Sequence, residues 1–335
     1  MKIGIKDVAK KAGVSSATVS RTLSNPELVT ENTRSKVMEA VNATGYKPNR
    51  FGASLRTQKS GNVVVVMPDI TNQVNASIIR AIEREAMDAG YSVLLGDTQN
   101  SEERERHYGE MVLSGQADGI LVFTPRLPFE LGNLTKLPAI VNSCEEIDHA
   151  DVCKVTIDNE AGAITAVEHL ISLGHTKIAA IKGPSLTPST RDRLAGYKKA
   201  LQKADIPIDE KYIITGDYGV ESGIAAMEKL LKLKSRPTAV FCFSDDMAIG
   251  AMNTLRENEY NIPQDMSIIG FDDISYASLM SPKLTTIKQP LEALGRQCMK
   301  TLLKLMKGQQ PEQKVMQLPF ELVVRQSTAA PKAGT

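Results

Sequence analysis

Apolar runs alternate with amphipathic stretches from residue 61 onward, and this alternation most strongly constrains what the chain can fold into. Continuous apolar runs are typical of parallel strands buried on both faces, and amphipathic stretches are typical of the helices that cover them. The expected strands are 63–67, 92–96, 119–123 and 139–142, and, in a second series, 178–182, 213–216, 239–243 and 267–271. Helical patterns such as 76–89, 193–204 and 247–257 lie between them. Two series predict two α/β lobes.

Charge is divided unevenly along the chain. The 335 residues carry a formal net charge of +1, from 40 Lys and Arg and 39 Asp and Glu. Residues 1–60 hold 11 of the bases and 4 of the acids, a balance of +7, which leaves −6 for the rest. A basic segment beside an acidic body is typical of a nucleic-acid-binding head, and charge alone leaves a solvated basic surface as the alternative.

The first sixty residues contain two short helical patterns separated by a turn. Apolar residues follow the spacing of one helical face over 5–12, and Gly13 ends that pattern. Ser15 is a suitable N-cap for a second helix over 16–23. Two helices joined by a short Gly-containing turn form a helix-turn-helix, whose second helix enters the DNA major groove.

Side chains of the second helix are the candidates for DNA contact. Arg21 can donate two hydrogen bonds to guanine, and Ala17 can pack on a thymine methyl group. Hydroxyl groups can bind phosphate without reading the base sequence. The contacts expected in this part of the chain are Ser15, Ser16, Ala17, Thr18, Ser20, Arg21 and Asn25.

A third helical pattern covers 33–44, with Thr30 as its cap and Gly45 after its end. Val37 and Met38 are expected to support the first two helices, together with Val41. Helix pairs of this kind also occur in proteins that never meet DNA, so periodicity alone does not decide between the two classes.

The residues of this segment are more specific than its periodicity. The stretches IKDVA (5–9), AGVS (12–15), ATVSR (17–21) and GYKPN (45–49), with Asn25-Pro26 and Val29, resemble the headpiece of the LacI/GalR family of bacterial transcription regulators. The resemblance continues to about Arg325. The segment RLPF (126–129) is similar to the cytidine-responsive branch of the family, whereas 191–197 is more similar to sugar-responsive members.

The resemblance implies that residues 50–60 are a hinge helix and linker. In the family this helix orders when two subunits lie on operator DNA, and a leucine from each wedges into the minor groove. Leu55 occupies that position here, and Arg56 beside it can bind phosphate or a narrowed minor groove. The alternative is that Leu55 packs on its own headpiece.

The resemblance also implies a two-lobed body of the type I periplasmic-binding-protein architecture. The expected fold is an all-α helix-turn-helix headpiece over 1–49, followed by an α/β body with parallel sheets over 61–335. The chain would cross between lobes near Asp158, Gln289 and Leu318. These crossings assign about 61–158 and 290–320 to the N-lobe, and about 159–288 to the C-lobe.

Polar residues follow the expected strands where each strand ends. Ligands of open α/β sheets bind beyond the carboxyl ends of the strands, and converging hydrogen-bonding groups suit a sugar, polyol or nucleoside. The candidate effector contacts are Asp69, Asn72, Asn75, Arg126, Asn142, Asp158, Arg191, Arg193, Phe243, Ser244 and Asp272. The resemblance supports Arg193 and Asp272 most directly, because both positions usually contact effector in the family. For the others, helix capping or turn formation is the alternative.

One departure from the family concerns aromatic stacking. Many relatives carry an aromatic pair after the first strand of the body, where this chain has Val74 and Asn75. Any aromatic contact to a ligand would then have to come from Phe123, Tyr218, Phe243 or Phe271.

The sequence contains no pattern that indicates catalysis. Its four histidines lie outside any nucleophile elbow, HExxH or Cys/His metal spacing. Asp272 and Asp273 are adjacent, so they diverge rather than face one glycosidic bond. We expect neither an enzyme nor a cofactor or metal. An extracytoplasmic solute-binding protein would share such a body, but would carry a signal peptide and lack the basic headpiece.

The sequence thus predicts a DNA-binding transcription regulator, most simply a repressor, controlled by a small sugar or nucleoside. Two headpieces of a homodimer would meet a pseudo-palindromic operator, with Ile78, Ile79 and Ile82 as candidate dimer contacts. No apolar run reaches the roughly 18 residues of a membrane span, and Met1 opens no signal-peptide core. We expect a cytoplasmic protein, at the nucleoid when bound to operator, with no membrane partner.

Overall fold

The computed structural model describes residues 3–47, 59–130, 132 and 136–332. The chain forms two compact units, residues 1–60 and 61–335. The described part of the first unit is helical, and the second unit is built on two sheets. Among the described residues, no helix is long and apolar enough to cross a membrane.

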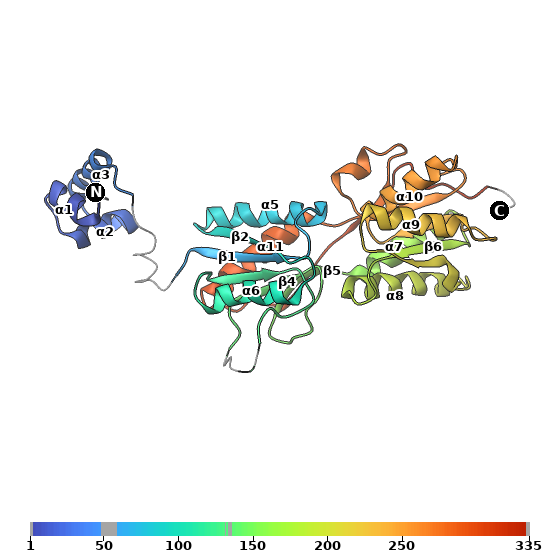
Figure 1. The fold of residues 1–335 in the computed structure, drawn as a ribbon, viewed down its shortest axis with the longest axis horizontal. Helices are drawn as coiled ribbons and strands as arrows, with labels where there is room; N and C mark the ends of the chain where they lie inside the picture. The colour runs from blue at the N-terminus through green and yellow to red at the C-terminus, as the bar shows by residue number, and fades with distance from the viewer. Residues whose placement is uncertain (1–2, 48–58, 131, 133–135, 333–335) are drawn as a thin grey trace. The chain divides into compact units, whose positions relative to one another are not determined.

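The first unit is a helix-turn-helix with a supporting helix. In chain order it contains α1 (Ile5–Ala12), α2 (Ser16–Ser24), the 3-10 helix η1 (Pro26–Leu28) and α3 (Glu31–Thr44) (Figure 1). Gly13 follows α1 with a φ of 67°, a left-handed conformation that glycine adopts without strain. Ser15 caps α2, because its hydroxyl oxygen accepts a hydrogen bond from the Thr18 amide at 3.1 Å. The predicted helix-turn-helix is confirmed.

A small apolar core holds these helices together. Val8 of α1, Val19 of α2 and Val37 of α3 are fully buried. The prediction that Met38 belongs to this core is wrong, because its side chain is 41% exposed whereas Ala40 is buried. Consecutive helical residues point about 100° apart, so Met38 does not share the buried face of Val37.

Sheet A of the second unit is fully parallel. It contains β1 (Asn62–Met67), β2 (Ser92–Asp97), β3 (Gly119–Val122), β4 (Ile140–Ser143), β5 (Cys153–Ile157) and β11 (Val315–Leu318), in the order β11-β5-β4-β3-β1-β2. Val63 and Val65 share a core with α5 (Gln73–Asp88) and α11 (Leu291–Met306), whereas Val64 and Val66 share one with α6 (Glu102–Leu113). Burial on both faces explains the continuous apolar runs of these strands.

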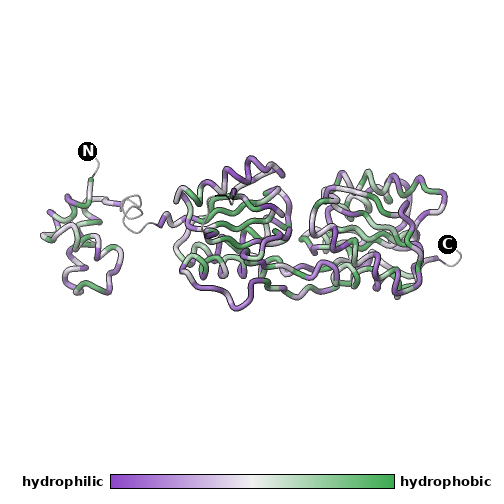
Figure 2. Tube along the Cα trace, turned by 90° about the horizontal axis from the view of Figure 1, so that it is seen from below, coloured by the Kyte–Doolittle hydropathy of each residue, from purple (hydrophilic) through white to green (hydrophobic). Residues whose placement is uncertain are grey.

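Sheet B is parallel except at one edge. It contains β6 (Ile178–Lys182), β7 (Ile213–Thr215), β8 (Ala239–Cys242), β9 (Ser267–Asp272), β10 (Thr285–Lys288) and β12 (Glu321–Val323), in the order β12-β10-β9-β8-β6-β7. Only the pair of β10 with β12 is antiparallel among these strands. The accompanying helices are α7 (Asn159–Ser172), α8 (Pro188–Lys203), α9 (Val220–Leu231) and α10 (Asp245–Glu257), with the 3-10 turns η3 (Glu210–Tyr212) and η4 (Ser275–Ser278). In Figure 2 the strands of both sheets are mostly apolar, and the helices that cover them are more polar.

Within the described residues, the chain passes between the sheets after β5, after β10 and after β11. The last passage returns the chain to sheet B, where the Ser327 carbonyl accepts a hydrogen bond from the Ile268 amide at 2.8 Å. We call the part built on sheet A the N-lobe and the part built on sheet B the C-lobe.

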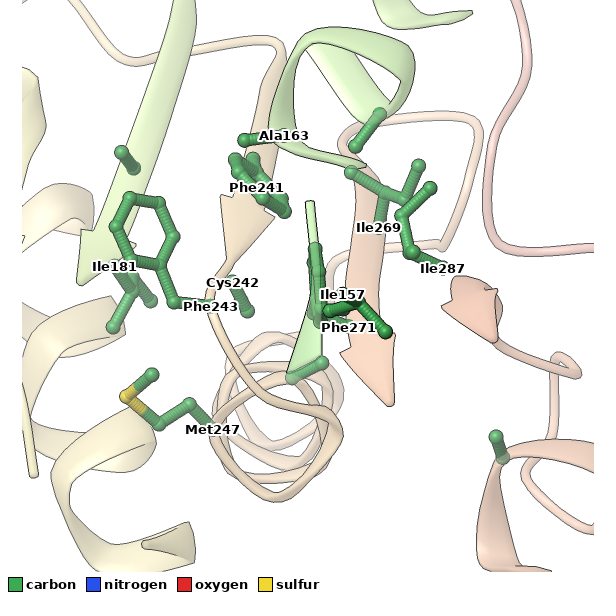
Figure 3. Packing of buried hydrophobic residues seen from close by; sticks show 14 of the residues in the cluster. Ile157, Ala163, Ile181, Phe241, Cys242, Phe243, Met247, Ile269, Phe271 and Ile287 are labelled. Carbon is green, nitrogen blue, oxygen red and sulfur yellow. The ribbon is translucent and has the colours of Figure 1, made fainter. Parts of the chain in front are cut away.

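Aromatic rings fill the core of the C-lobe. The centroid of the Phe241 ring lies 4.9 Å from that of Phe243 and 6.4 Å from that of Phe271 (Figure 3). All three side chains are fully buried. Tilted aromatic pairs at such distances attract each other, and dense packing resists movement. The carboxyl ends of β8 and β9 therefore rest on a rigid support.

The sequence did not predict β5, β10, β11 or β12 as strands. Each is short and mixes polar with apolar residues, as in the Thr-Thr-Ile-Lys sequence of β10. The segments β10, β11 and β12 show neither a continuous apolar run nor a clean alternation, so their neighbours define them, as when β10 pairs with β9 on one side and with β12 on the other. The Cys-Lys-Val-Thr-Ile sequence of β5 does alternate, and the prediction overlooked this short signal.

The apolar face of α5 lies inside the N-lobe. Ile78 and Ile82 are fully buried, and Ile79 packs partly buried against the same core. A Cβ atom on Gly295 of α11 would lie 2.5 Å from the Ile78 carbonyl oxygen, so glycine allows α11 to approach α5 closely. The prediction that Ile78 and Ile82 contact a second subunit is wrong, because a helix from far along the chain covers them.

Candidate functional site

A cleft of about 490 Å³ lies between the N-lobe and the C-lobe. Residues that follow strands of sheet A line one side, and residues that follow strands of sheet B line the other. Its polar lining includes Asp69, Thr71, Asn72, Asn75, Asn100, Thr124, Glu145, Asn159, Thr187, Ser189, Arg193, Asp217, Tyr218, Ser244, Asp246, Asp272 and Gln289. A cleft of this volume suits a small molecule with several hydrogen-bonding groups.

Arg193 of α8 is a buried cation in the wall of the cleft. Its Nε donates a hydrogen bond to Oδ1 of Asn159 at 2.9 Å, and its Nη1 donates one to the Phe243 carbonyl. The guanidinium lies 3.7 Å from the centroid of the Phe271 ring. These partners are neutral, so the charge is oriented by the C-lobe but not neutralised by these contacts.

Asp272 stands at the end of β9 with an unusual φ of 131°. It accepts a hydrogen bond from Nε2 of Gln289 at 2.6 Å. Burial raises the pKa of Asp272 to about 6, although the nearby charge of Arg193 opposes the shift. Behind it, burial and the charge of Asp272 hold the pKa of Asp245 well above its usual range. The site therefore contains carboxyl groups whose ionisation is costly.

Tyr218 connects the cleft to the beginning of α8. Its hydroxyl oxygen lies 2.7 Å from Oγ of Ser189 and 2.6 Å from Oγ1 of Thr190. A Cβ atom on Gly183 would lie 2.2 Å from the Tyr218 ring, so a larger residue there would displace the ring. Burial raises the pKa of Tyr218, so its hydroxyl stays protonated and able to donate.

Non-glycine residues with a left-handed backbone gather around the cleft. They are Asn100, Cys144, Tyr218 and Asp272, with φ values of 60°, 65°, 76° and 131°. Such conformations cost energy and persist where the surrounding structure imposes them, often at functional sites. The cleft thus combines buried charge with local backbone strain.

Several predicted effector contacts line the cleft, namely Asp69, Asn72, Asn75, Arg193, Ser244 and Asp272. Two of them also cap helices. Asn72 accepts hydrogen bonds from the amides of Val74 and Asn75 at the beginning of α5, and Ser244 accepts one from the Met247 amide at the beginning of α10.

The structure places Arg126 outside this lining. Its guanidinium makes two hydrogen bonds to the carboxylate of Glu105 in α6, at 3.0 and 2.7 Å, and one to the Asn100 carbonyl at 3.2 Å. Glu105 is 1% exposed, so Arg126 compensates a buried charge. Hydrogen bonding to Glu105 raises the pKa of Arg126. Arg126 thus fixes the loop that carries Asn100 rather than facing the cleft.

Asn142 is fully buried below the cleft. Its Nδ2 donates to the carbonyls of Val122, Thr124 and Glu145, at 2.9, 3.3 and 2.8 Å. Its Oδ1 accepts from the Ile147 amide at 2.9 Å. These bonds hold the turn after β4, so Asn142 supports the site from behind.

The remaining predicted contacts also lie outside the lining. Asp158 caps α7 by accepting a hydrogen bond from the Ala161 amide at 2.8 Å. Arg191 is exposed and pairs with Asp192 at 2.8 Å. Phe243 is buried in the core, where its carbonyl, not its ring, contacts the buried arginine.

Sequence reasoning missed several residues of the cleft, namely Glu145, Asn159, Ser189, Asp246 and Gln289. Asn159 and Gln289 follow β5 and β10, so recognition of these strands would have found them by the strand-end rule. Ser189 lies at the start of α8 and no strand-end signal marks it.

Of the aromatic candidates, Phe123 and Tyr218 line the cleft, whereas Phe243 and Phe271 lie in the core.

The predicted DNA contacts of the first unit lie on and around α2. Ser15, Ala17, Arg21 and Asn25 are exposed, and Ser16, Thr18 and Ser20 are half-buried. The predicted contacts Leu55 and Arg56 lie outside the described residues.

Family models match both units. The model of bacterial regulatory proteins of the lacI family matches residues 4–49, and that of the periplasmic binding protein-like domain matches 167–328. The chain is 40% identical over 328 residues to the HTH-type transcriptional repressor CytR of Escherichia coli K12. The aligned region covers 97% of this chain and 96% of that protein. It is 36% identical to catabolite control protein A of Priestia megaterium, over 98% of this chain and all of the relative.

The chain belongs to the LacI family. Its fold matches the Lac repressor dimer bound to operator and the anti-inducer ONPF, with a TM-score of 0.89 and 30% identity over 98% of this chain and 100% of that one. The regulator CelR in complex with cellobiose gives a TM-score of 0.74 at 29% identity, over 97% of this chain and 99% of that one. This LacI-family protein is a transcriptional regulator with a DNA-binding helix-turn-helix and an effector-binding domain. Its relatives are regulators, not enzymes.

The ion pair of Arg126 and Glu105 generates a first prediction. Arg126→Ala leaves the buried Glu105 carboxylate without its partner, and we expect a loss of about 3 kcal/mol in the free energy of unfolding. Urea titration measures this free energy of unfolding. Arg106→Ala is the matched control, because its exposed pair with Glu102 at 3.8 Å should contribute less than about 1 kcal/mol. Equal effects of the two substitutions would contradict the role of Arg126.

Burial of Asp272 generates a second prediction. The pKa of Asp272 is raised to about 6 in the folded protein, whereas an aspartate in the unfolded chain has a pKa of about 4. Above about pH 6 the buried carboxylate is ionised, and its full cost is subtracted from the free energy of unfolding. This cost disappears as the pH falls from about 6 towards 4, because the carboxyl group becomes protonated. We expect Asp272→Asn to raise the unfolding free energy by about 1–3 kcal/mol at pH 7.5, and much less at pH 4.5.

The neighbouring residue supplies the control for this measurement. Asp273 pairs with Arg325 at 2.6 Å, and both side chains are largely buried. Asp273→Asn should therefore lower stability at pH 7.5, the opposite sign from Asp272→Asn. A destabilising Asp272→Asn at pH 7.5 would show that its ionised form is stabilising.

Proposed function

We propose that this regulator is an operator-binding repressor, in which a small hydroxylated effector in the cleft changes the relation of the two lobes. One chain contains both a helix-turn-helix, in which Arg21 is exposed, and a cleft, in whose wall Arg193 and Asp272 are buried. This combination is the main support for the proposal. Charged groups that are buried without a structural need are typical of ligand sites.

The charges of the cleft favour a neutral sugar or nucleoside. Carboxyl groups of Asp69, Glu145, Asp217, Asp246 and Asp272 line it, whereas Arg193 is the one basic side chain in its described lining. Carboxylates accept hydrogen bonds from hydroxyl groups and repel phosphate. Arg193 and Asp272 would hold neighbouring hydroxyl groups of the effector, as a donor and an acceptor.

The DNA contacts that we propose are those of α2, with Leu55 and Arg56 of the hinge segment. Ser16, Ala17 and Arg21 would reach base edges, and the hydroxyl groups would contact phosphate at Ser15, Thr18 and Ser20. The CytR, catabolite control protein A and Lac repressor relatives support this assignment, since the Lac repressor structure contains operator.

We also propose that two copies of the chain form a homodimer. They would meet through an exposed apolar surface that differs from the apolar face of α5. Tyr276 and Leu279 are 53% and 76% exposed at and after η4, and Ile70 is 38% exposed just before α5. A hydrogen bond of 3.0 Å from Ser275 Oγ to Gln73 Oε1 brings these two segments together. Exposed apolar groups that gather in this way are typical of subunit contacts.

An extracytoplasmic solute-binding protein is the alternative function for such a body. The described headpiece argues against it, because a separate helix-turn-helix unit serves no purpose in solute capture. We infer that the protein acts by binding rather than by catalysis, in keeping with its relatives.

The two binding functions should separate by mutation. We expect Arg21→Ala and Leu55→Ala each to weaken operator binding by about 10–100-fold, because a bidentate base contact and a minor-groove wedge are each worth about 1–3 kcal/mol. Fluorescence anisotropy with operator DNA measures this. Arg193→Ala and Asp272→Ala should leave operator affinity without effector unchanged.

Effector binding gives the reciprocal result. In a thermal-shift screen of sugars and nucleosides on the full chain, a compound that stabilises the wild-type body should still stabilise Arg21→Ala, but not Arg193→Ala. A compound that stabilises Arg193→Ala and Asp272→Ala as strongly as the wild type would overturn the proposed site.

The dimer surface is tested with a matched pair of exposed leucines. Leu279→Asp should weaken self-association by at least about tenfold, because it places a charge in an apolar contact. Leu186, which is 94% exposed in another loop, is the control, and Leu186→Asp should leave association unchanged. Sedimentation velocity over a concentration series distinguishes the two, and equal association of both variants argues against the surface.

A further inference from the structure

Asp245, the first residue of α10, is fully buried and lies outside the cleft lining, although its neighbours Ser244 and Asp246 both belong to that lining. Acidic residues are common in the first turn of a helix, because the helix dipole attracts them. Asp246 has that position too and stays partly exposed. The dipole therefore does not explain why the Asp245 carboxyl group is withdrawn from water.

The strands beneath α10 are shaped around this carboxyl group. Its Oδ1 accepts a hydrogen bond from Oγ1 of Thr286 in β10 at 2.6 Å. A Cβ atom on Gly270 of β9 would overlap the same oxygen, so glycine leaves the space that the carboxyl group occupies. Burial of a carboxyl group is costly, and an apolar side chain would avoid the cost. The fold thus keeps a buried acid at a position where stability alone does not favour one.

The other oxygen of Asp245 holds the turn that follows β9. Oδ2 accepts a hydrogen bond from the Ile274 amide at 2.9 Å. Asp272 and Asp273, which precede Ile274, have φ values of 131° and 58°. Such conformations cost energy in residues other than glycine, and they persist only where the surroundings impose them. Asp245 supplies part of that support.

The tie also acts in the reverse direction. Burial raises the pKa of Asp272, and the backbone amide of Asp245 is among the groups that oppose this rise. The amide therefore lies close to the Asp272 carboxylate, while the Asp245 carboxyl group binds the turn that carries Asp272.

We propose that Asp245 is a positioning residue of the effector site, which sets the spacing between the start of α10 and the carboxylate of Asp272. Ser244 and Asp246 stand on one side of this tie and Asp272 on the other, and all three line the cleft. If the tie is disturbed, the strained turn relaxes and Asp272 moves away from its partners. The inference rests on the proposed function, because that function assigns these cleft residues to an effector.

Two substitutions disturb the Asp245 carboxyl group without changing any charge. Gly270→Ala places a methyl group where Oδ1 lies, and Thr286→Val removes the hydroxyl group that donates to Oδ1 but keeps the shape of the side chain. Thr254→Val is the matched control. Thr254 is a buried threonine further along α10, whose hydroxyl group donates to the Gly250 carbonyl at 3.1 Å.

The displacement is followed by carbon-13 NMR of the aspartate carboxyl groups, in the full chain without effector. Asp272→Asn assigns the signal. The charged groups that act on Asp272 include Arg193, Asp245 and Asp246, and every test variant keeps them. We expect the titration midpoint of Asp272 to fall from about 6 by about one pH unit or more in Gly270→Ala and in Thr286→Val, because a displaced carboxylate regains water.

The control separates this positioning role from a general loss of stability. Thr254→Val should lower the melting temperature but leave the Asp272 midpoint at the parent value, because it does not touch the turn. Parent-like midpoints in both Gly270→Ala and Thr286→Val would overturn the proposal. An equal fall in Thr254→Val would overturn it as well, since the midpoint would then report only a looser lobe.

Ligand binding separates the positioning role from the proposed function. Cytidine, adenosine, ribose and cellobiose are titrated calorimetrically against the parent protein and the three variants. A compound that binds the parent should bind Gly270→Ala and Thr286→Val about tenfold more weakly, and Thr254→Val equally well, since a hydrogen bond to a charged group contributes that much. Equal affinity for all four proteins would overturn the role of Asp245 in the effector site.

Binding of none of these compounds to the parent would contradict the proposed effector class. The NMR midpoints would still decide whether Asp245 sets the position of Asp272, because they are measured without any ligand.

Discussion

Burial of parallel strands on both faces is the constraint on which the rest of this structure depends. Such strands offer no polar surface along their length, so side chains with chemical roles must come from the residues that follow each strand. In a parallel sheet these residues gather at one edge. Here the edges of sheets A and B line one cleft, which is why residues as distant in sequence as Asp69 and Asp272 share it.

Many polar side chains near that cleft support it rather than face it. Asn142 and Arg126 use their donors on backbone carbonyls and on a buried carboxylate, because polar groups that leave water need partners. Arg193 and Asp272 are held by fewer hydrogen-bond partners, all of them neutral, and their opposite charges lie near each other at the wall of the cleft. This difference in partners, more than residue type, separates supporting residues from those suited to bind an effector.

The organisation of the chain was largely predictable from its sequence. The glycine and serine at the turn of the helix-turn-helix, and the apolar runs of the central strands, are local signals, since each depends only on near neighbours. The strand-end rule correctly brought Asp69 and Asp272 to one cleft, and the family resemblance added Arg193 of α8. It missed Asn159 and Gln289, because the short alternation of β5 was overlooked and β10 is defined by its pairing partners rather than by its own composition.

The sequence by itself determined the two units, the helix-turn-helix whose second helix carries Arg21, and the α/β body, because capping and periodicity act over a few residues. Only the tertiary structure decided which polar residues line the cleft, that α11 covers Ile78 and Ile82, and that Asp245 holds the turn after β9. Those outcomes depend on contacts between segments far apart along the chain, and no local pattern records such contacts.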